Sequence, residues 1–261
     1  LGDVYKRQVY TLYRYLGGMM KKLLSLFLVL AMLVTICSDN IYAANAATNK
    51  KKVICIDAGH QTKANLEKEP IGPGAKTTKF KVTGGTSGLW TKQTEYALAL
   101  KVAKKLQKIL KKRGYKVIMC RTKNDVNISN SERAAIANEA NADAFIRIHA
   151  NGAANKAVNG AMTICQTKKN PYNSDIYSSS KLLSDKVLDG VVAKSGCKKL
   201  YVWETDTMSG INWSKVPVTI VEMGYMTNEK EDRALNTSSY QKKMAEGMAD
   251  GIDAYFKALG K

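Results

Sequence analysis

The chain has 261 residues, of which 45% are hydrophobic, and its formal net charge at pH 7 is +19. This length suits one domain of α/β size, or at most two small ones. Internal repeats and low-complexity domains are not evident, and no RNA- or DNA-binding signature accompanies the positive charge, which disfavours a nucleic-acid partner.

The first 47 residues read as a leader rather than as part of a fold. Residues 1–18 precede two methionines, have no clear apolar period and look like sequence upstream of the true start. Residues 19–47 have the layout of a signal peptide: two lysines, an apolar stretch too short for a comfortable membrane span, and small residues where a signal peptidase reads. We expect export with cleavage after Ala46, and one domain over residues 48–261.

Two other fates of the leader are less well supported. A lipoprotein anchor at Cys37 is disfavoured because the bulky Ile36 precedes it where a small residue is expected. An uncleaved leader would leave the chain attached to a membrane, which is the only membrane contact that we expect.

The positive charge persists when the leader is set aside. Residues 1–47 hold five basic and two acidic side chains, so about +16 remains on the rest of the chain. Six lysines of one expected helix carry much of it: Lys101, Lys104, Lys105, Lys108, Lys111 and Lys112. The charge either serves solubility or attracts an anionic polymer, and outside a cell this would be cell-wall material.

Four cysteines follow the leader, and no two of them form a C-x-x-C pair. Cys55, Cys120 and Cys165 lie in apolar runs typical of strands, whereas Cys197 does not. We expect them to pack in the core as free thiols, although an exported protein permits disulfides.

The first expected strand covers residues 53–57, an apolar and mostly β-branched run typical of a buried parallel strand. Gly59 permits a sharp turn after it, and His60 follows. Residues 61–89 lack a sustained apolar period and predict a long polar loop. Such a loop either walls a cleft or is a surface insertion.

A helix is expected from about Thr94 to Arg113, with Thr91 and Thr94 as candidate N-cap residues. Glu95 lies in its first turn and on the same face as the apolar stripe that begins at Leu98. An inward carboxylate needs a cation or another partner. The alternative is a favourable charge at the helix N-terminus.

The remaining elements continue the alternation of strands and helices. Strands are expected at 115–120, 144–148, 158–165, around Tyr201 and Trp203, and at 216–221. Helices are expected from the N-cap Ser131 to 140, at 182–192, after a capping box of Asn228 and Glu231, and at 239–259, with a loop at 208–213. The pattern predicts an α/β fold: a single domain whose mostly parallel, twisted sheet has helices on both faces.

Ionisable residues end three of the expected strands: His60, His149 and Glu222. If these strands are parallel, their ends meet at one edge of the sheet, which Glu95 can also approach. Two imidazoles and a carboxylate suit a catalytic zinc ion with a fourth position for water, and the other glutamate would transfer the proton. Spacing alone does not assign the two glutamates.

Other hydrolytic and phosphate-binding motifs are missing from the sequence. It contains no G-x-S-x-G, no H-E-x-x-H and no glycine-rich loop before a lysine. Neither histidine has an obvious serine or cysteine nucleophile in a matching context.

Several segments, in order, resemble the zinc-dependent N-acetylmuramoyl-L-alanine amidases of bacterial cell walls, the amidase 3 family. They are Ile56-Asp57-Ala58-Gly59-His60, Glu95 opening a helix, Ser131-Glu132-Arg133 with Ala137-Asn138, Ile148-His149-Ala150-Asn151 and Val221 to Asn228. The resemblance covers about residues 52–258. It implies His60, Glu95 and His149 as zinc ligands and Glu222 as the catalytic carboxylate. The implied reaction cleaves the amide between N-acetylmuramic acid and L-alanine in peptidoglycan.

Two features depart from the family pattern. Arg147 stands where many relatives carry a small hydroxyl residue, and it would either contact an acidic stem peptide or line the sheet. The 61–89 segment is longer than in compact members. We expect Asn151 and Arg147 to be substrate contacts. Two alternative functions remain: a non-catalytic wall-binding or regulatory protein, and a zinc peptidase that cuts within the stem peptide.

Overall fold

The computed structural model describes residues 51–260 and, before them, residues 2–3, 6–10, 13–14, 16, 19–20, 27 and 32, which are helical. The chain divides into two units, Leu1–Lys50 and Lys51–Lys261. Most of the expected leader, with its cleavage position after Ala46, lies outside the described residues and stays a prediction. No helix in the described part of the chain combines the length and apolarity needed to cross a bilayer.

A six-stranded sheet runs through the second unit in the order β4-β1-β5-β8-β6-β7. Its strands are β1 (Val53–Ala58), β4 (Lys116–Met119), β5 (Ala144–Asn151), β6 (Ala161–Cys165), β7 (Lys199–Glu204) and β8 (Val218–Tyr225). Strands β4, β1, β5 and β8 are mutually parallel, β6 is antiparallel to β8, and β7 is parallel to β6. The predicted mostly parallel sheet is confirmed, including the strand around Tyr201 and Trp203.

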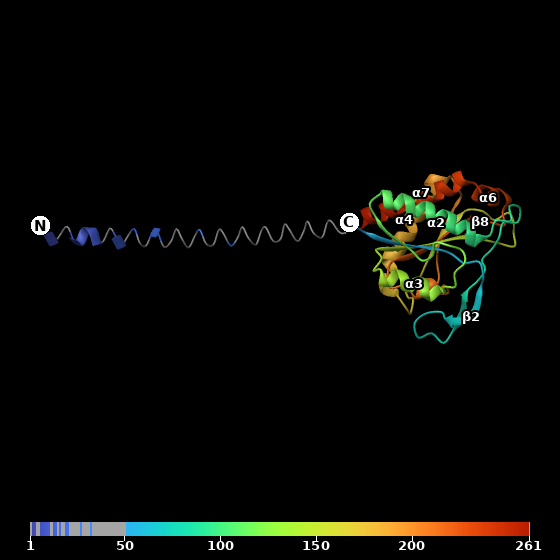
Figure 1. Cartoon of the computed structure of the whole chain (residues 1–261), viewed down its shortest axis with the longest axis horizontal. Helices are drawn as coiled ribbons and strands as arrows, with labels where there is room; N and C mark the ends of the chain where they lie inside the picture. Colours follow the sequence, from blue (N-terminus) through green and yellow to red (C-terminus); the bar gives the residue numbers. More distant parts are fainter. Residues whose placement is uncertain are drawn as a thin grey trace. The chain divides into compact units, whose positions relative to one another are not determined.

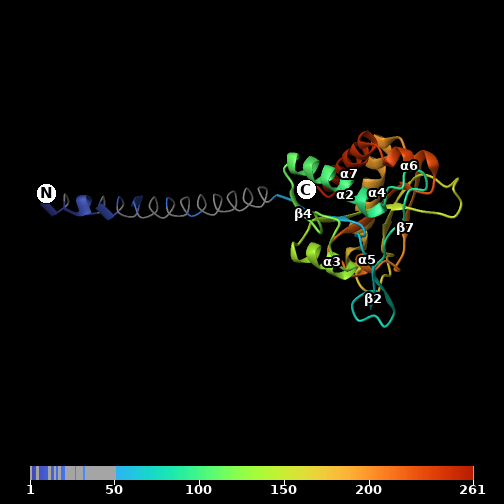
Figure 2. The ribbon, with the colours of Figure 1, turned by 45° about the vertical axis from the view of Figure 1, so that its right-hand side comes forward.

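Helices cover both faces of this sheet, as predicted. One face carries α2 (Glu95–Lys112), α4 (Tyr177–Ser195) and α7 (Ser238–Ala258), and the other carries α3 (Asn130–Glu139) and the short α5 (Ser209–Asn212) (Figures 1 and 2). The 3₁₀ helix η1 (Ser174–Ile176) precedes α4, and α6 (Glu229–Leu235) precedes α7. Alternate residues of β5 enter the two cores: Ile146 and Ile148 belong to the core that α2, α4 and α7 cover, and Phe145 belongs to the core on the α3 side.

The segment 61–89 is not the unstructured loop that was predicted. It contains an antiparallel hairpin of β2 (Asn65–Pro70) and β3 (Thr78–Val82), which projects from the α3 side of the molecule (Figure 1). The sequence signal was weak because the hairpin buries little: of its strand residues, only Glu69 and Val82 are fully buried. No apolar alternation was therefore available to indicate strands.

Several predicted helix ends are wrong in detail. Helix α3 is capped by Ser129, not Ser131, through a capping box in which Ser129 Oγ accepts from Glu132 N and the Glu132 carboxylate accepts from Ser129 N. Thr94 is the N-cap of α2 but makes no side-chain cap bond.

The capping box predicted at Asn228 is half formed. Asn228 Oδ1 accepts from Glu231 N, but the Glu231 carboxylate instead accepts from the backbone amides of Tyr225 and Gly160. Residues 208–213, predicted as an exposed loop, contain the buried α5, a single turn that is too short to show a helical period.

The prediction of core packing is confirmed for Cys55, Cys120 and Cys165, whereas Cys197 is half-buried at the edge of the core. All four cysteines in residues 51–260 are free, and Cys55, Cys120 and Cys165 are buried. The thiols of Cys55 and Cys120 lie 3.7 Å apart in the core on the α3 side.

Candidate metal centre

Three side chains meet at the carboxyl edge of the parallel strands. His60 follows β1, His149 lies near the end of β5, and Glu95 is the first residue of α2. Glu95 Oε1 lies 3.1 Å from His60 Nε2 and 2.9 Å from His149 Nδ1, and the two nitrogens are 3.2 Å apart. The predicted convergence of these three residues is therefore present, and the inward direction of Glu95, which is 4% exposed, is confirmed.

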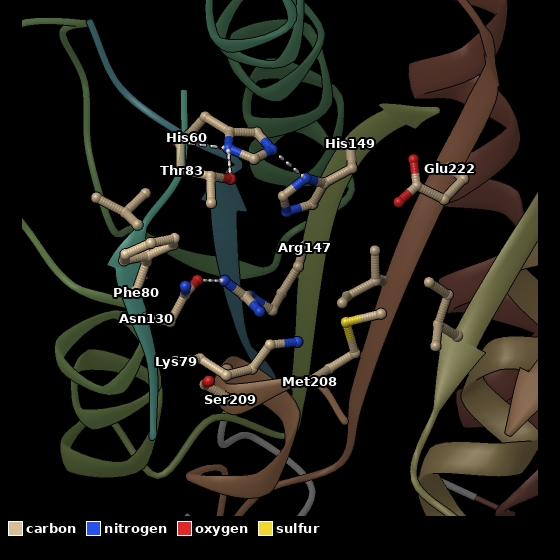
Figure 3. Close-up of a pocket in the computed structure, with 14 residues that line it drawn as sticks. His60, Lys79, Phe80, Thr83, Asn130, Arg147, His149, Met208, Ser209 and Glu222 are labelled. Carbon is tan, nitrogen blue, oxygen red and sulfur yellow. Dashed lines mark hydrogen bonds between the residues drawn. The ribbon is translucent and has the colours of Figure 1, made fainter. Parts of the chain in front are cut away.

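The triangle formed by these three atoms has the size of one face of a small tetrahedron. Tetrahedral ligands 2.0–2.1 Å from a zinc ion are about 3.3 Å apart, close to the separations here. His60 Nδ1 lies 2.8 Å from the backbone oxygen of Thr83 (Figure 3). Because a carbonyl only accepts, Nδ1 donates to it, and Nε2 is left as the nitrogen of His60 that faces the centre of the triangle.

Glu95 is held as a carboxylate. Its Oε2 accepts a hydrogen bond from Thr86 N (2.8 Å), and its Oε1 accepts one from Ala150 N (3.2 Å). Burial would raise the pKa of Glu95, but hydrogen bonds from His149 and His60 outweigh it and hold that pKa well below its ordinary value. Glu95 therefore offers a negative charge to a cation at this point.

The ring of His149 packs directly against the backbone of Gly59. A Cβ on residue 59 would lie 2.2 Å from His149 Cε1, so only glycine leaves room for the imidazole in this position. Burial lowers the pKa of His149, which favours the neutral form that ligates metals. Its other nitrogen, Nε2, is buried and has no partner among the described residues.

Two buried arginines fix the turn that carries His60. The backbone of His60 has a φ of 58°, which is unfavourable for a residue with a side chain. Arg121 donates to the carbonyls of Ala58 and Gly59, and Arg133 donates to those of Ala58 and His60. These bonds satisfy three successive carbonyls and hold the strained turn in place.

Asp57 anchors this arginine network below the turn. It is fully buried, and its two oxygens bind Arg133 Nη1 (2.7 Å) and Arg147 Nε (3.0 Å). Sequence reasoning missed this ion triad. The available signal was an aspartate ending an apolar strand, together with one arginine in the first turn of an expected helix and another inside an apolar strand.

Glu222 lies next to the three clustered residues. It is the cross-strand partner of His149 on β8, and both side chains point into the same cavity (Figure 3). Its Oε2 is buried without a partner among the described residues. Burial, and then the charge of Glu95, raises the pKa of Glu222 to about 8.

Two depressions open from this point. The first, about 270 Å³, is lined by His60, His149, Glu222 and Arg147 on one side and by the β3 hairpin and α5 on the other. Of the two alternatives left open for segment 61–89, the structure favours the cleft wall, because Lys79, Phe80, Val82 and Thr83 line this depression. The second, about 390 Å³, reaches past Thr86 and Thr227 and is lined by Asn151. The two expected substrate contacts, Arg147 and Asn151, therefore lie in different depressions.

Comparisons with known proteins point to one family. A family model described as N-acetylmuramoyl-L-alanine amidase (Amidase_3) matches residues 54–254. The chain is 29% identical over 163 residues to the amidase LytC of Bacillus subtilis, covering 62% of this chain and 31% of LytC. It is 27% identical over 175 residues to the probable cell wall amidase LytH of Staphylococcus aureus, and the match covers 67% of this chain and 54% of LytH. The chain thus spans 31% of the length of LytC and 54% of the length of LytH.

Solved structures share the fold. The catalytic domain of CwlV, an amidase from Bacillus (Paenibacillus) polymyxa var. colistinus, aligns with a TM-score of 0.63 and 27% identity over 79% of this chain and 98% of that one. Ami1 from Mycobacterium smegmatis aligns with a TM-score of 0.72 and 22% identity over 79% of this chain and 97% of Ami1. This likeness is one of fold alone. Since the family model covers most of residues 51–260, the chain belongs to the N-acetylmuramoyl-L-alanine amidase family.

Proposed function

We propose that the chain hydrolyses the amide between N-acetylmuramic acid and L-alanine in peptidoglycan, with one zinc ion held by His60, Glu95 and His149. The observation that carries this proposal is the triangle of donor atoms with Glu222 beside it. Two neutral imidazoles and one carboxylate form a donor set typical of catalytic zinc, which keeps its fourth position for water.

When bound, zinc would lower the pKa of a water molecule to about 7 and polarise the scissile carbonyl. Glu222 would then transfer the proton. Its unpartnered Oε2 takes a proton from the attacking water and returns it to the nitrogen of the leaving alanine. The raised pKa of Glu222 suits the step in which the carboxyl holds the proton and returns it to the leaving nitrogen. A cation bound beside it would favour the ionised form that takes the proton from water.

We also propose where the chain acts and which residues contact the substrate. The family and the named relatives support action at the cell wall, and we propose that the chain is exported by the leader at residues 19–47. Asn151 and Arg147 would contact the substrate on either side of the proton-transferring Glu222. The positive charge, with exposed lysines along α2, would favour anionic wall polymers.

Digestion of purified peptidoglycan tests the proposal. The purified protein, with and without a metal chelator, is incubated with the polymer and the released fragments are identified by mass spectrometry. The proposal requires intact stem peptides with a free alanine amino terminus, and their loss after chelation. Shortened stems would indicate a peptidase, and binding to the polymer without release would indicate a non-catalytic wall protein.

A further inference from the structure

The 270 Å³ cavity that leads away from the metal centre is basic at its far end. Of the residues that line it, Lys79 and Arg147 carry positive charge, and Glu222 at the metal end is the one acidic residue. The walls between them are largely apolar, with Phe80, Ile164 and Ile220 among them. A low-polarity cleft with two cations at one end is suited to an extended ligand that carries an anionic group there.

Arg147 is placed to bind such a group. Its Nε binds Asp57 and its Nη2 donates to Asn130 Oδ1 (2.7 Å), which fixes the plane of the guanidinium (Figure 3). Its Nη1 has no hydrogen-bond partner within residues 51–260. This nitrogen lies against the backbone of Gly210, where a Cβ would be 1.9 Å away, so α5 leaves room for the guanidinium at the cavity wall.

The charge of Arg147 is only partly compensated. Asp57 is shared between Arg133 and Arg147, so one carboxylate faces two guanidinium groups. Lys79 adds a third cation from the hairpin: its side chain points into the cavity, and its ammonium group donates to the backbone oxygen of Thr207, before α5 (Figure 3). The basic end of the cavity therefore has a net positive charge and free donors.

The spacing indicates where on the ligand the anion lies. Arg147 and His149 are two residues apart on β5 and face the same side, so they are separated by about 6.6 Å along the strand. An extended peptide covers this distance in about two residues. With the scissile bond at the metal centre, the group at Arg147 belongs to the residue that follows the alanine.

From this arrangement we infer that Arg147 and Lys79 form a binding site for the carboxylate of the second stem-peptide residue, and that the enzyme discriminates a free carboxylate there from an amidated one. The identity of the ligand rests on the proposed amidase function. The peptide then occupies the cavity beneath the β2–β3 hairpin, and the glycan side of the substrate occupies the depression lined by Asn151 and Thr227.

The test compares two dipeptides by calorimetric titration against the purified protein. One is L-alanyl-D-glutamate with a free α-carboxylate and with its side-chain γ-carboxyl blocked as the methylamide, and the other is the same blocked peptide with the α-carboxylate amidated. Loss of a charge-assisted hydrogen bond corresponds to about tenfold weaker binding or more, so the acid is expected to bind at least about tenfold more tightly than the amide.

Variants locate the discrimination. Lys79→Gln is expected to reduce the preference for the acid over the amide, and Arg147→Met is expected to abolish this preference. Lys76→Gln is the control: it removes the same charge from the exposed hairpin turn, outside the cavity, and should leave the preference unchanged. Because Arg147 also neutralises buried Asp57, its variant risks misfolding, and Lys79→Gln then carries the test. Equal binding of the two peptides by the wild type, or equal effects of Lys76→Gln and Lys79→Gln, would overturn the inference.

Hydrolysis of the matching muramyl dipeptides separates this inference from the proposed function. Cleavage of both forms with equal kcat/KM supports the amidase and overturns the carboxylate site. Preferential binding of the acid without cleavage of either form supports the carboxylate-binding site and contradicts the proposed amidase function.

Discussion

Glu222 and His149 are paired across neighbouring parallel strands, so that the Glu222 carboxyl, whose Oε2 has no partner within residues 51–260, and the largely covered imidazole enter one cavity side by side. The parallel register of β5 and β8 sets this relationship, and a shift of one residue would turn Glu222 to the opposite face. The proximity of the Glu222 carboxyl to the candidate metal centre therefore follows from the pairing of the strands.

Replacement of Glu222 by Gln is expected to remove hydrolysis while leaving metal binding intact. The amide is nearly the same size but cannot accept the proton of water, and general acid–base catalysis contributes about 10²- to 10⁴-fold in rate. Turnover of a muramyl dipeptide and the metal content of the dialysed protein are measured together. Full activity in Glu222→Gln would refute the role assigned to this residue.

Replacement of Gly59 by Ala is expected to displace the His149 ring, because the new methyl group would lie 2.2 Å from Cε1. Metal content and hydrolysis should both fall by at least about tenfold, as for the loss of a positioning contact around a metal ligand. Gly84→Ala is the matched control, because Gly84 lies in the segment after β3 and a Cβ there meets nothing within 4 Å. If both variants retained metal equally, the packing argument would be wrong.

Loss of Arg133 is expected to destabilise the fold strongly. Arg133→Met leaves buried Asp57 with one cation in place of two and leaves the His60 carbonyl without its donor. Breaking a buried ion pair costs about 3–5 kcal/mol. The exposed pair of Arg233 and Glu229 provides the control, since Arg233→Met should cost no more than about 1 kcal/mol. Urea unfolding of both variants measures the difference, and similar losses would contradict this account.

Acid should weaken the same network. Burial would raise the pKa of Asp57, but the charges of Arg133 and Arg147 outweigh it and hold that pKa well below its ordinary value of 3.8. A carboxyl whose pKa is lower in the folded state stabilises the fold above its unfolded pKa and loses this contribution as the pH falls toward its folded pKa. Asp57→Asn should therefore be less stable than wild type at pH 7, and the difference should narrow below about pH 4.

This prediction is checked by urea unfolding at pH 7, 5 and 3 in the presence of a chelator, which removes any contribution of metal release. A stability difference between Asp57→Asn and wild type that stays constant from pH 7 to pH 3 would show that Asp57 is not ionised against the two arginines.

The sequence predicted the parts of this molecule that leave a regular pattern. Apolar runs ending in His60, His149 and Glu222 predicted parallel strands with a common edge, and the helical stripe placed Glu95 inward; all four meet there. The central strands are apolar on both faces. The polar residues at their ends are therefore easy to recognise in the sequence, which is why these positions could be predicted.

Features that depend on only a few residues could not be predicted from sequence patterns. The β2–β3 hairpin is mostly solvent-exposed and shows no alternation, and α5 is a single turn. The bonds from Arg121 and Arg133 to the turn carbonyls are made between distant segments, so spacing does not reveal them. Arg147 was predicted either to contact substrate or to line the sheet; it binds Asp57 and also lines the cavity.

Metal content measured together with activity tests the central claim most directly. The purified protein should hold one zinc ion per chain, should release intact stem peptides from peptidoglycan, and should lose both properties when chelated or when His60 is replaced by Ala. Chelated protein that digests peptidoglycan as fast as the metal-loaded protein would contradict the account, as would a His60→Ala variant that keeps its zinc.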